Sequence, residues 1–487
     1  MARSLAGLCA AQALFLVAGL GVLWALRGWR TWADVFRLAG VAYLVGVALV
    51  AVEATLVLVA GARIGTPFVV ALSLGSAAVG AAVALLRRRP APRGLGLERP
   101  RFEPSSLAAL SGALITAVVL AAFFRTARLQ GNVAYDAWAF WVPKAKAIYF
   151  FGGLDEQLFR TLPGPSYPLL VPALQAMDFH LMGSADTATL AVQYWFLLVG
   201  FVLAMWGLLR PLVPAVLIWP FLALVTLMPE LDKRMLNAQA DWPLDIFFAI
   251  AALCLACWLT TREPWLLGCY ALLLAAVMAT KREGQLLTAC VVAAGLAATW
   301  RSARSAWLWI VGLAALAYAV NLPWRIWWTS RHLLPDTPDS GVGKLSATAS
   351  RVAPAFRIVL ELLFSYDLWL VATPIAVAAA VAVVFRREYG LATLYLMTSA
   401  LAVVGFTWIL WSIPSLPLDT SQLTPIPRAV GSVVLLSIVF APLLLSRLRA
   451  GEPAGPITSG RGEQIMAATW EESISGARAS WRRWRLP

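Results

Sequence analysis

The chain has little charge and no long hydrophilic stretch. Of its 487 residues, 13% are charged and 61% are hydrophobic, whereas soluble globular proteins average about 25% charged and about 45–50% apolar residues. No hydrophilic segment is long enough for a conventional soluble domain. The composition therefore excludes an ordinary soluble protein and indicates a chain that lies in a membrane.

Histidine is scarce, and cysteine occurs only in apolar surroundings. The two histidines, His180 and His332, are too few for a histidine-built metal centre. The five cysteines all fall within apolar segments; Cys254 and Cys257 form a C-x-x-C there without further ligands. Packing therefore explains these thiols better than zinc binding or redox chemistry.

Apolar runs long enough to cross a bilayer, which takes about 20 residues, recur along the chain. The first run has no small-residue cleavage site, so we expect a retained helix rather than a signal peptide. We predict an all-α polytopic membrane protein with about thirteen transmembrane helices. The expected spans are 5–26, 38–60, 66–86, 105–124, 187–208, 213–228, 242–260, 265–279, 284–300, 306–324, 367–385, 390–411 and 428–446.

The net charge of +14 comes from basic residues in short segments between the apolar runs. Orientation determinants lie in such segments, so the charge favours membrane topology over nucleic-acid binding. When the basic segment Arg87–Arg101 is placed in the cytosol, nearly every other basic turn falls on the same side, and the opposite orientation fails at almost every loop. We therefore expect a multi-pass cell-membrane protein with outer segments at 125–186, 229–241, 280–283 and 325–366.

Four parts follow from this pattern. We expect N-terminal transmembrane helices over 1–86, a basic cytosolic linker over 87–104, a transmembrane catalytic core over 105–450, and a cytosolic tail over 451–487. The tail is basic and amphipathic, with tryptophans along one helical face, which is typical of a helix that binds anionic lipid. A disordered tail is the alternative.

Asp136 is the first candidate for chemistry. It lies just past the outer end of the fourth span, in the aromatic stretch 131–141. A carboxylate at that position can act as a general base toward an acceptor hydroxyl, which contributes about 10²–10⁴-fold to a rate. A solvated helix cap is the alternative interpretation.

Four of the cations on the predicted outer face, against the inside bias of the basic turns, are candidates for binding. They are Lys144, Lys146, Lys281 and Arg282. Binding of a phosphate group is one reason to keep basic residues there. The alternatives are contact with lipid headgroups for the first two, and a tight turn with a local pair between Lys281 and Glu283 for the others.

Two further carboxylates begin a predicted span. Asp241 marks an outer helix start with Pro243 in the first turn, which an N-cap would also explain. Asp245 lies one turn deeper. A carboxylate within a span costs a few kcal/mol and normally faces the bundle interior or a wet cavity, so it indicates function.

Four stretches, in this order, resemble those of bacterial GT-C glycosyltransferases, the group that includes protein O-mannosyltransferases and lipid A aminoarabinose transferases. The resemblance covers about 105–445 and leaves the first three spans without a counterpart. The stretches are Tyr135-Asp-Ala-Trp-Ala-Phe-Trp141, Ser166-Tyr-Pro-Leu-Leu-Val-Pro172, Gln239-Ala-Asp-Trp-Pro-Leu244 and Thr280-Lys-Arg-Glu-Gly284.

The resemblance implies an inverting transfer of a sugar from a polyprenyl-phosphate carrier to a glycan, lipid or protein hydroxyl outside the cytoplasm. Asp136 would be the base that deprotonates the acceptor. The leaving lipid phosphate is already a stable anion, so the chemistry needs nearby positive charge more than a general acid. Lys144, Lys146, Lys281 and Arg282 are the candidates for that charge.

One departure from the family pattern leaves two points open. Many relatives carry an acidic pair in the first-loop motif, whereas Ala137 follows Asp136 here. The second acid could be Asp241, Asp155 or Glu156. The sequence indicates no metal ligand set, and a requirement for a divalent metal stays open.

Three other functions compete with this one. A transporter or lipid-linked sugar flippase is the strongest, but it predicts repeated halves with paired broken helices, and no such repeat is visible. An enzyme resembling the O-antigen ligases would carry its main outer loop late in the chain, whereas the richest loop here is early. A non-catalytic assembly partner that binds membrane lipid is the third.

Overall fold

The computed structural model describes residues 2–96, 106–129, 134–235, 237–300, 304–333, 349–413, 418 and 425–449. In this part of the chain all regular secondary structure is helical, which confirms the predicted all-α class. The predicted tail at 451–487 and the second half of the predicted linker lie outside the described residues.

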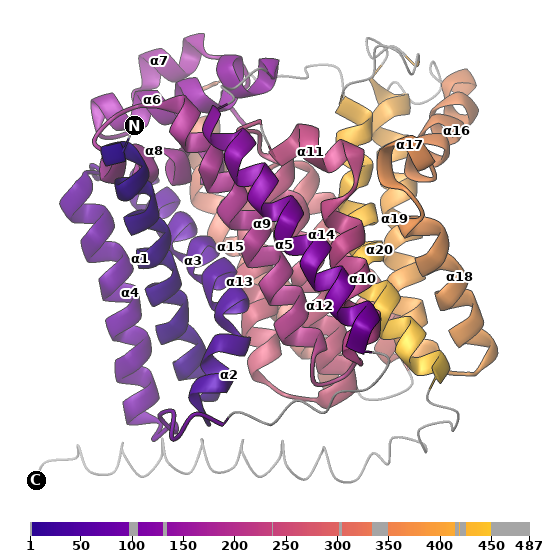
Figure 1. Cartoon of the computed structure of the whole chain (residues 1–487). Coiled ribbons are helices and arrows are strands. Elements are labelled where there is room, and N and C mark those ends of the chain that lie inside the picture. Colours follow the sequence, from indigo (N-terminus) through magenta and orange to yellow (C-terminus); the bar gives the residue numbers. More distant parts are fainter. Residues whose placement is uncertain are drawn as a thin grey trace, which may run out of the picture.

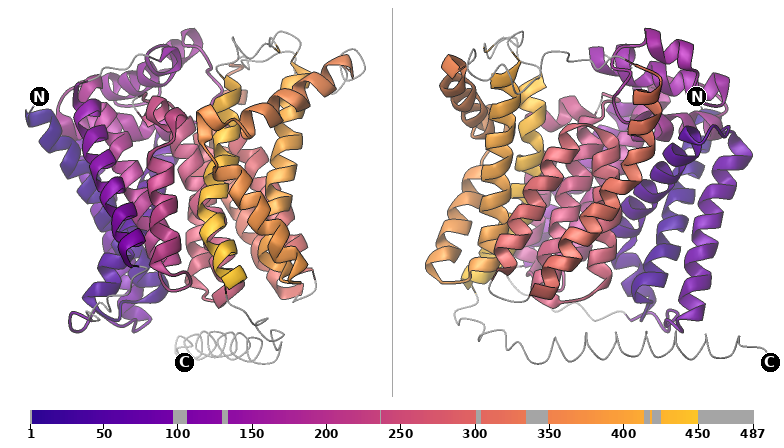
Figure 2. Two further views of the ribbon diagram at one scale, coloured as in Figure 1. Left: turned by 45° about the vertical axis from the view of Figure 1, so that its right-hand side comes forward. Right: turned by 180° about the vertical axis from the view of Figure 1, so that it is seen from behind.

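Nine helices of the described residues are long and apolar enough to cross a membrane. Each coincides with a predicted span, which confirms the multi-pass membrane architecture. They stand roughly side by side across the bundle (Figures 1 and 2). Their bounds are α1 Ala2–Arg27, α3 Ala39–Val59, α4 Thr66–Leu86, α5 Ser106–Leu129, α9 Thr187–Leu209, α12 Asp241–Thr261, α15 Arg304–Ser330, α19 Tyr389–Ser412 and α20 Pro425–Arg449.

Four shorter apolar helices coincide with the other predicted spans. The shortest have 12 and 14 residues, about 18–21 Å at 1.5 Å per residue, less than the roughly 30 Å of a bilayer core. The total of thirteen crossings therefore stays a prediction. These helices are α10 Ala215–Thr226, α13 Trp265–Thr280, α14 Glu283–Thr299 and α18 Ala372–Phe385.

The predicted span 367–385 is interrupted. Tyr366–Trp369 forms the separate short helix α17, and Leu370 follows with a φ of 55° before α18 begins. A positive φ cannot continue a right-handed helix, so α17 ends there. This conformation is also strained for leucine. Hydropathy cannot detect such a break, since both sides of it are apolar.

The short helices gather at one end of the bundle, and α2 (Trp32–Arg37) lies at the other (Figure 1). The end with most short helices is the one that we predict to face outward. It also holds a π-helical turn, η1 (Ala137–Trp141). The short helices there are α6 Val142–Phe151, α7 Glu156–Thr161, α8 Leu170–Met182, α11 Pro229–Met235 and α16 Val352–Leu363; the 3-10 turn η3, Ala349–Arg351, precedes α16.

Helix α12 forms the centre of the bundle. Its residues from Asp241 to Trp258 are buried on every side, whereas α4, α5 and α15 have only about a fifth of their most apolar part buried. A helix that is apolar and covered all round is typical of the core of a membrane bundle. Because α12 runs from one end of the bundle to the other, it connects the two regions described below.

Glycines set the spacing of the first helices. A Cβ on Gly19 of α1 would clash with the Ala42 carbonyl of α3, and one on Gly46 of α3 would clash with the Phe15 carbonyl. Small residues at such positions let two membrane helices approach at backbone distance. Helix α3 also packs closely on α9, where a Cβ on Gly40 would clash with the backbone at Ala204.

Candidate functional site

Asp136 lies at the end of the bundle that holds most of the short helices, directly before the π-helical turn η1. It occupies the cap position of this turn but makes no capping hydrogen bond with its side chain, so the helix-cap interpretation is wrong. Its side chain is 36% exposed, and its Oδ2 accepts a hydrogen bond from Arg428 Nη1 at 2.5 Å. Single π-helical turns occur frequently at functional sites. The carboxylate is thus paired with one cation and still open on another side.

Arg428 joins Asp136 to a second carboxylate. The same Nη1 lies 3.6 Å from Oδ2 of Asp241, whose side chain is only 4% exposed. Asp241 is the first residue of α12, with Ala240 at the cap position and no side-chain cap, so the N-cap interpretation of Asp241 is also wrong. The first helical turn instead directs this acid toward cations from other helices.

Lys281 extends the series of charges. Its Nζ lies 2.9 Å from Oδ1 of Asp241 and 3.0 Å from Oε1 of Glu283. Burial by itself would lower the pKa of Lys281, but these two carboxylates offset it and hold the pKa above its usual value. The result is an alternating series of acid and base, Asp136–Arg428–Asp241–Lys281–Glu283, which we call the outer charge chain.

The turn that carries Lys281 requires a glycine. Helix α13 ends at Thr280, and α14 begins at Glu283. A Cβ on Gly284 would clash with the Val277 carbonyl of α13. The glycine therefore permits the close helix reversal that holds Lys281 between its two carboxylates.

A buried ion pair lies beside the outer charge chain. Nη1 of Arg234 in α11 is 2.6 Å from Oδ2 of Asp245, and Ser432 donates a hydrogen bond to the other oxygen of that carboxylate. Arg234 and Asp245 have only 2% and 1% of their side chains exposed. As expected for a carboxylate within a span, Asp245 faces the bundle interior. A Cβ on Gly431 of α20 would clash with the guanidinium of Arg234.

Aromatic rings surround the next part of the site. Arg282 donates a hydrogen bond to Ser166 Oγ, and its guanidinium carbon lies 5.0 Å from the ring centroid of Tyr167. The Tyr167 ring in turn meets the rings of Phe140 and Trp141 at 5.0 and 5.8 Å between centroids. The segment around Ser166 is thus fixed between η1 and the α13–α14 turn.

The four stretches that carry the family resemblance therefore meet in space. Asp136 is linked to Asp241 through Arg428, and Asp241 binds Lys281. The residue after Lys281, Arg282, binds the 166–167 segment. Stretches that lie up to 146 residues apart in the chain, from 136 to 282, form one continuous cluster.

Two of the predicted cations have different surroundings. Lys144 is 1% exposed; it donates a hydrogen bond to the Gly164 carbonyl and lies 3.9 Å from the centroid of Phe140. These contacts hold the loop before Ser166, and the ammonium has no open surface on which to meet a lipid phosphate. Lys146 is partly exposed and forms no ion pair with any residue that the structure describes.

Asp155 and Glu156 lie outside the outer charge chain. Asp155 caps α7 by accepting a hydrogen bond from the Leu158 amide at 2.8 Å. Glu156 binds Arg160 at 2.6 Å and Arg331 at 3.2 Å; mainly the hydrogen bond from Arg160 lowers the pKa of this exposed carboxyl. Of the three predicted second acids, Asp241 is the one linked to Asp136.

Sequence reasoning missed Arg428 and Arg234. Arg428 begins the last span on the predicted outer face, so it is one more cation against the inside bias, the criterion that selected Lys281. Arg234 lies in the predicted outer segment 229–241, so the same criterion applies to it. The sequence indicated Glu283 only as a local partner of Lys281. In the structure it is the last member of the outer charge chain, which includes residues of α12 and α20.

A metal site was left open by the sequence. No group of three or more histidine, cysteine, aspartate or glutamate side chains in the described ranges is arranged to hold a metal ion. Arginine and lysine groups occupy the places between the carboxylates of the outer charge chain.

Comparison with protein-family models, with curated proteins and with solved structures gives no match. The assignment of function therefore depends on the site itself.

Proposed function

We propose that this chain is an inverting glycosyltransferase that moves a sugar from a polyprenyl-phosphate carrier to an acceptor hydroxyl outside the cytoplasm. The observation that supports the proposal most is the convergence of the four family-like stretches around the outer charge chain. A cluster of this kind in a membrane bundle is expensive to maintain, because each charge must be desolvated and paired. Such clusters are retained at functional sites.

Asp136 is the proposed base. It is the most exposed acid of the outer charge chain. Its side chain is 36% exposed, against 4% for Asp241 and 22% for Glu283. In the proposed step the acceptor oxygen bonds to the anomeric carbon as the bond from that carbon to the phosphate oxygen breaks. The hydroxyl proton passes to Asp136, and the lipid phosphate leaves as an anion. Arg428 orients the carboxylate for this transfer.

Lys281 and Arg282 are the proposed partners of the departing phosphate. Lys281 is held between two acids, and Arg282 is held over Tyr167, so both cations are fixed before a substrate arrives. Fixed charges stabilise a developing anion without reorganising during the reaction. Asp241 is assigned a supporting role, because it positions both Lys281 and Arg428.

The decisive experiment compares the full-length protein, Asp136→Asn and a deletion in the cells that use it. We expect Asp136→Asn to reproduce the deletion: the acceptor glycan is lost from the cell envelope and the lipid-linked sugar accumulates. The change removes the base but keeps its size, so activity falls about 10²–10⁴-fold. Glu361→Gln is the matched control, since within the described residues this exposed acid pairs with Arg357 on α16 and with no residue of the outer charge chain.

Full transfer by Asp136→Asn would overturn the assignment of the base. Movement of the lipid-linked sugar across the membrane without any transfer in the unmodified protein would overturn the enzyme itself and favour a flippase.

A further inference from the structure

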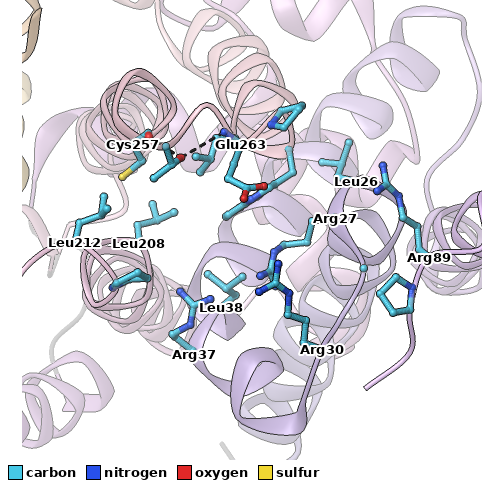
Figure 3. A pocket seen from close by; sticks show the side chains of 17 residues that line it. Leu26, Arg27, Arg30, Arg37, Leu38, Arg89, Leu208, Leu212, Cys257 and Glu263 are labelled. Atoms are coloured by element: carbon cyan, nitrogen blue, oxygen red, sulfur yellow. Dashed lines mark hydrogen bonds between the residues drawn. The ribbon is translucent and has the colours of Figure 1, made fainter. Parts of the chain in front are cut away.

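A second charged region lies at the other end of the bundle. A cavity of about 520 Å³ opens where α1, α2, α9 and the α12–α13 turn meet. Figure 3 shows its lining, which includes Arg27, Arg30, Arg37 and Arg89 and a single acidic side chain, Glu263. Helix α12 begins at Asp241 in the outer charge chain and ends at Thr261 in this cavity wall. We call the cavity the arginine pocket.

The backbone around the arginine pocket is fixed. Helix α1 ends at Arg27, and Gly28 follows with a φ of 78°; a Cβ there would lie 2.6 Å from Pro90 Cδ. The Trp29 amide donates to the Pro90 carbonyl at 2.8 Å, and Trp24 Nε1 donates to the same oxygen at 3.1 Å. These contacts join the segment after α1 to the segment after α4, so Arg30 and Arg89 are brought to one site from distant parts of the chain.

Two of the four arginines share one acid. Asp34 of α2 binds both Arg27 and Arg37, and Arg37 also donates to the Gly207 carbonyl at 2.8 Å. Burial raises the pKa of Asp34, but the hydrogen bonds from Arg27 and Arg37 outweigh it and lower the pKa overall. Asp34 is therefore ionised at neutral pH and neutralises one of the two cations.

The other two arginines have no acid. Within the described residues neither Arg30 nor Arg89 forms an ion pair, and the Nε of Arg89 is buried without a hydrogen-bond partner. Four arginines against Asp34 and Glu263 leave two positive charges uncompensated around one cavity. A buried donor without a partner is costly, and an anion in the cavity would compensate the excess positive charge around it.

The remaining lining is suited to a lipid. Leu26, Leu208, Leu212 and Trp265 supply apolar surface beside the arginines. Basic pockets between membrane helices on the cytosolic side are suited to lipid headgroups, and the cytosolic leaflet carries the anionic lipids. Guanidinium groups bind phosphate oxygens in a fixed, bidentate geometry.

We infer that the arginine pocket binds the phosphate group of an acidic phospholipid from the cytosolic leaflet. The phosphate lies between Arg30 and Arg89 and receives further hydrogen bonds from Arg27 and Arg37, while the acyl chains follow the apolar wall. This site is independent of the proposed transfer reaction, because it lies at the opposite end of α12.

The test uses purified full-length protein in phosphatidylcholine nanodiscs with and without phosphatidylglycerol. Retained acidic lipid is counted by native mass spectrometry, and its affinity is measured by titration. The double variant Arg30→Gln/Arg89→Gln leaves the pairs with Asp34 intact. We expect it to bind phosphatidylglycerol about 10- to 30-fold more weakly, given the contribution of each arginine near a membrane surface. The matched control is Arg87→Gln/Arg88→Gln, which removes the same charge from exposed residues of the same segment outside the pocket.

Equal weakening by both double variants would overturn the inference, because it would reduce the effect to general surface charge. Displacement of the lipid by millimolar inorganic phosphate or glycerol phosphate would overturn the lipid assignment in favour of a soluble anion. If the variant does not fold, the unmodified protein still decides: thermal stabilisation by phosphatidylglycerol over phosphatidylcholine supports the site, and no stabilisation contradicts it. Loss of transfer in Asp136→Asn with lipid binding unchanged would separate the two proposals.

Discussion

The two ends of helix α12 use charge in opposite ways. At the Asp241 end each cation of the outer charge chain lies between two carboxylates, so the acids outnumber the bases by one. At the Thr261 end four arginines surround a cavity with only Asp34 and Glu263 against them. The two ends belong to one helix of 21 residues, about 30 Å long.

The comparison shows that carboxylates, more than cations, distinguish the two faces. The predicted outer face carries many basic residues, but Arg428, Lys281 and Arg234 are each paired with acids from other helices. A cluster of paired charges is rigid and preoriented, which suits chemistry. An excess of one charge around a cavity suits binding of the opposite charge. Four predictions test this distinction.

The largest effect is expected from Arg234→Met. It leaves Asp245 buried at 1% exposure without its partner, and loss of one member of a buried ion pair costs about 3–5 kcal/mol. Thermal unfolding in detergent measures this loss of stability. Adding Asp245→Asn removes the second charge and should restore most of the stability, whereas Arg30→Met at the other end should change little. Equal stability of Arg234→Met and Arg30→Met would remove the distinction between the two ends.

The second prediction concerns Lys281→Met. The change leaves Asp241 and Glu283 unscreened and removes a cation from the proposed phosphate site, so kcat/KM should fall about 100-fold or more. Lys281→Arg should recover part of the activity. Lys233→Met is the control, since Lys233 is an exposed lysine 3.5 Å from Glu230 on the same face. A loss of the same size in that control would mean that outer-face charge in general, and not the outer charge chain, sets the rate.

Arg428→Lys should have a smaller effect, of about tenfold in kcat. The substitution keeps the charge but removes the planar group that reaches both Asp136 and Asp241. Arg128→Lys, at the outer end of α5, is the matched control. A steady-state assay that separates kcat from KM measures it; unchanged kcat would show that the link between the two acids is not needed for turnover.

The smallest effect is expected at Asp34 and depends on pH. Because its pKa is lowered in the folded protein, the ion pairs stabilise the fold above the unfolded value of 3.8 and are lost as the pH falls through the folded value. Wild type should therefore exceed Asp34→Asn in thermal stability at pH 6, and the difference should vanish in strong acid. A difference that does not shrink as the pH falls from 6 into strong acid would contradict the pairing.

The helices and the outer acids could be predicted from sequence because local rules govern them. Apolar runs identified the nine long helices, and position near a span end selected Asp136, Asp241 and Lys281. The partners could not be predicted in the same way. Arg428 is 292 residues from Asp136, and only the packing of α20 against α12 brings them together.

The surroundings of three other predicted site residues could not be predicted for the same reason. Lys144 was selected as an exposed cation, but a local fold in which Gly164 approaches the Phe140 ring buries it. Asp155 and Glu156 lie in the same predicted outer loop as Asp136, yet they stabilise α7 and its contact with Arg331. Proximity in sequence within a long loop does not predict proximity in space.

Gly431 sets a limit on what this bundle can tolerate. It lies one turn after Arg428 on α20, at the point where the helix passes the guanidinium of Arg234 without room for a β-carbon. Adding one methyl group there would displace the Arg234 guanidinium from its pair with Asp245. A hydrogen atom as a side chain, which bears no charge and touches no substrate, thus leaves the room in which this buried ion pair forms.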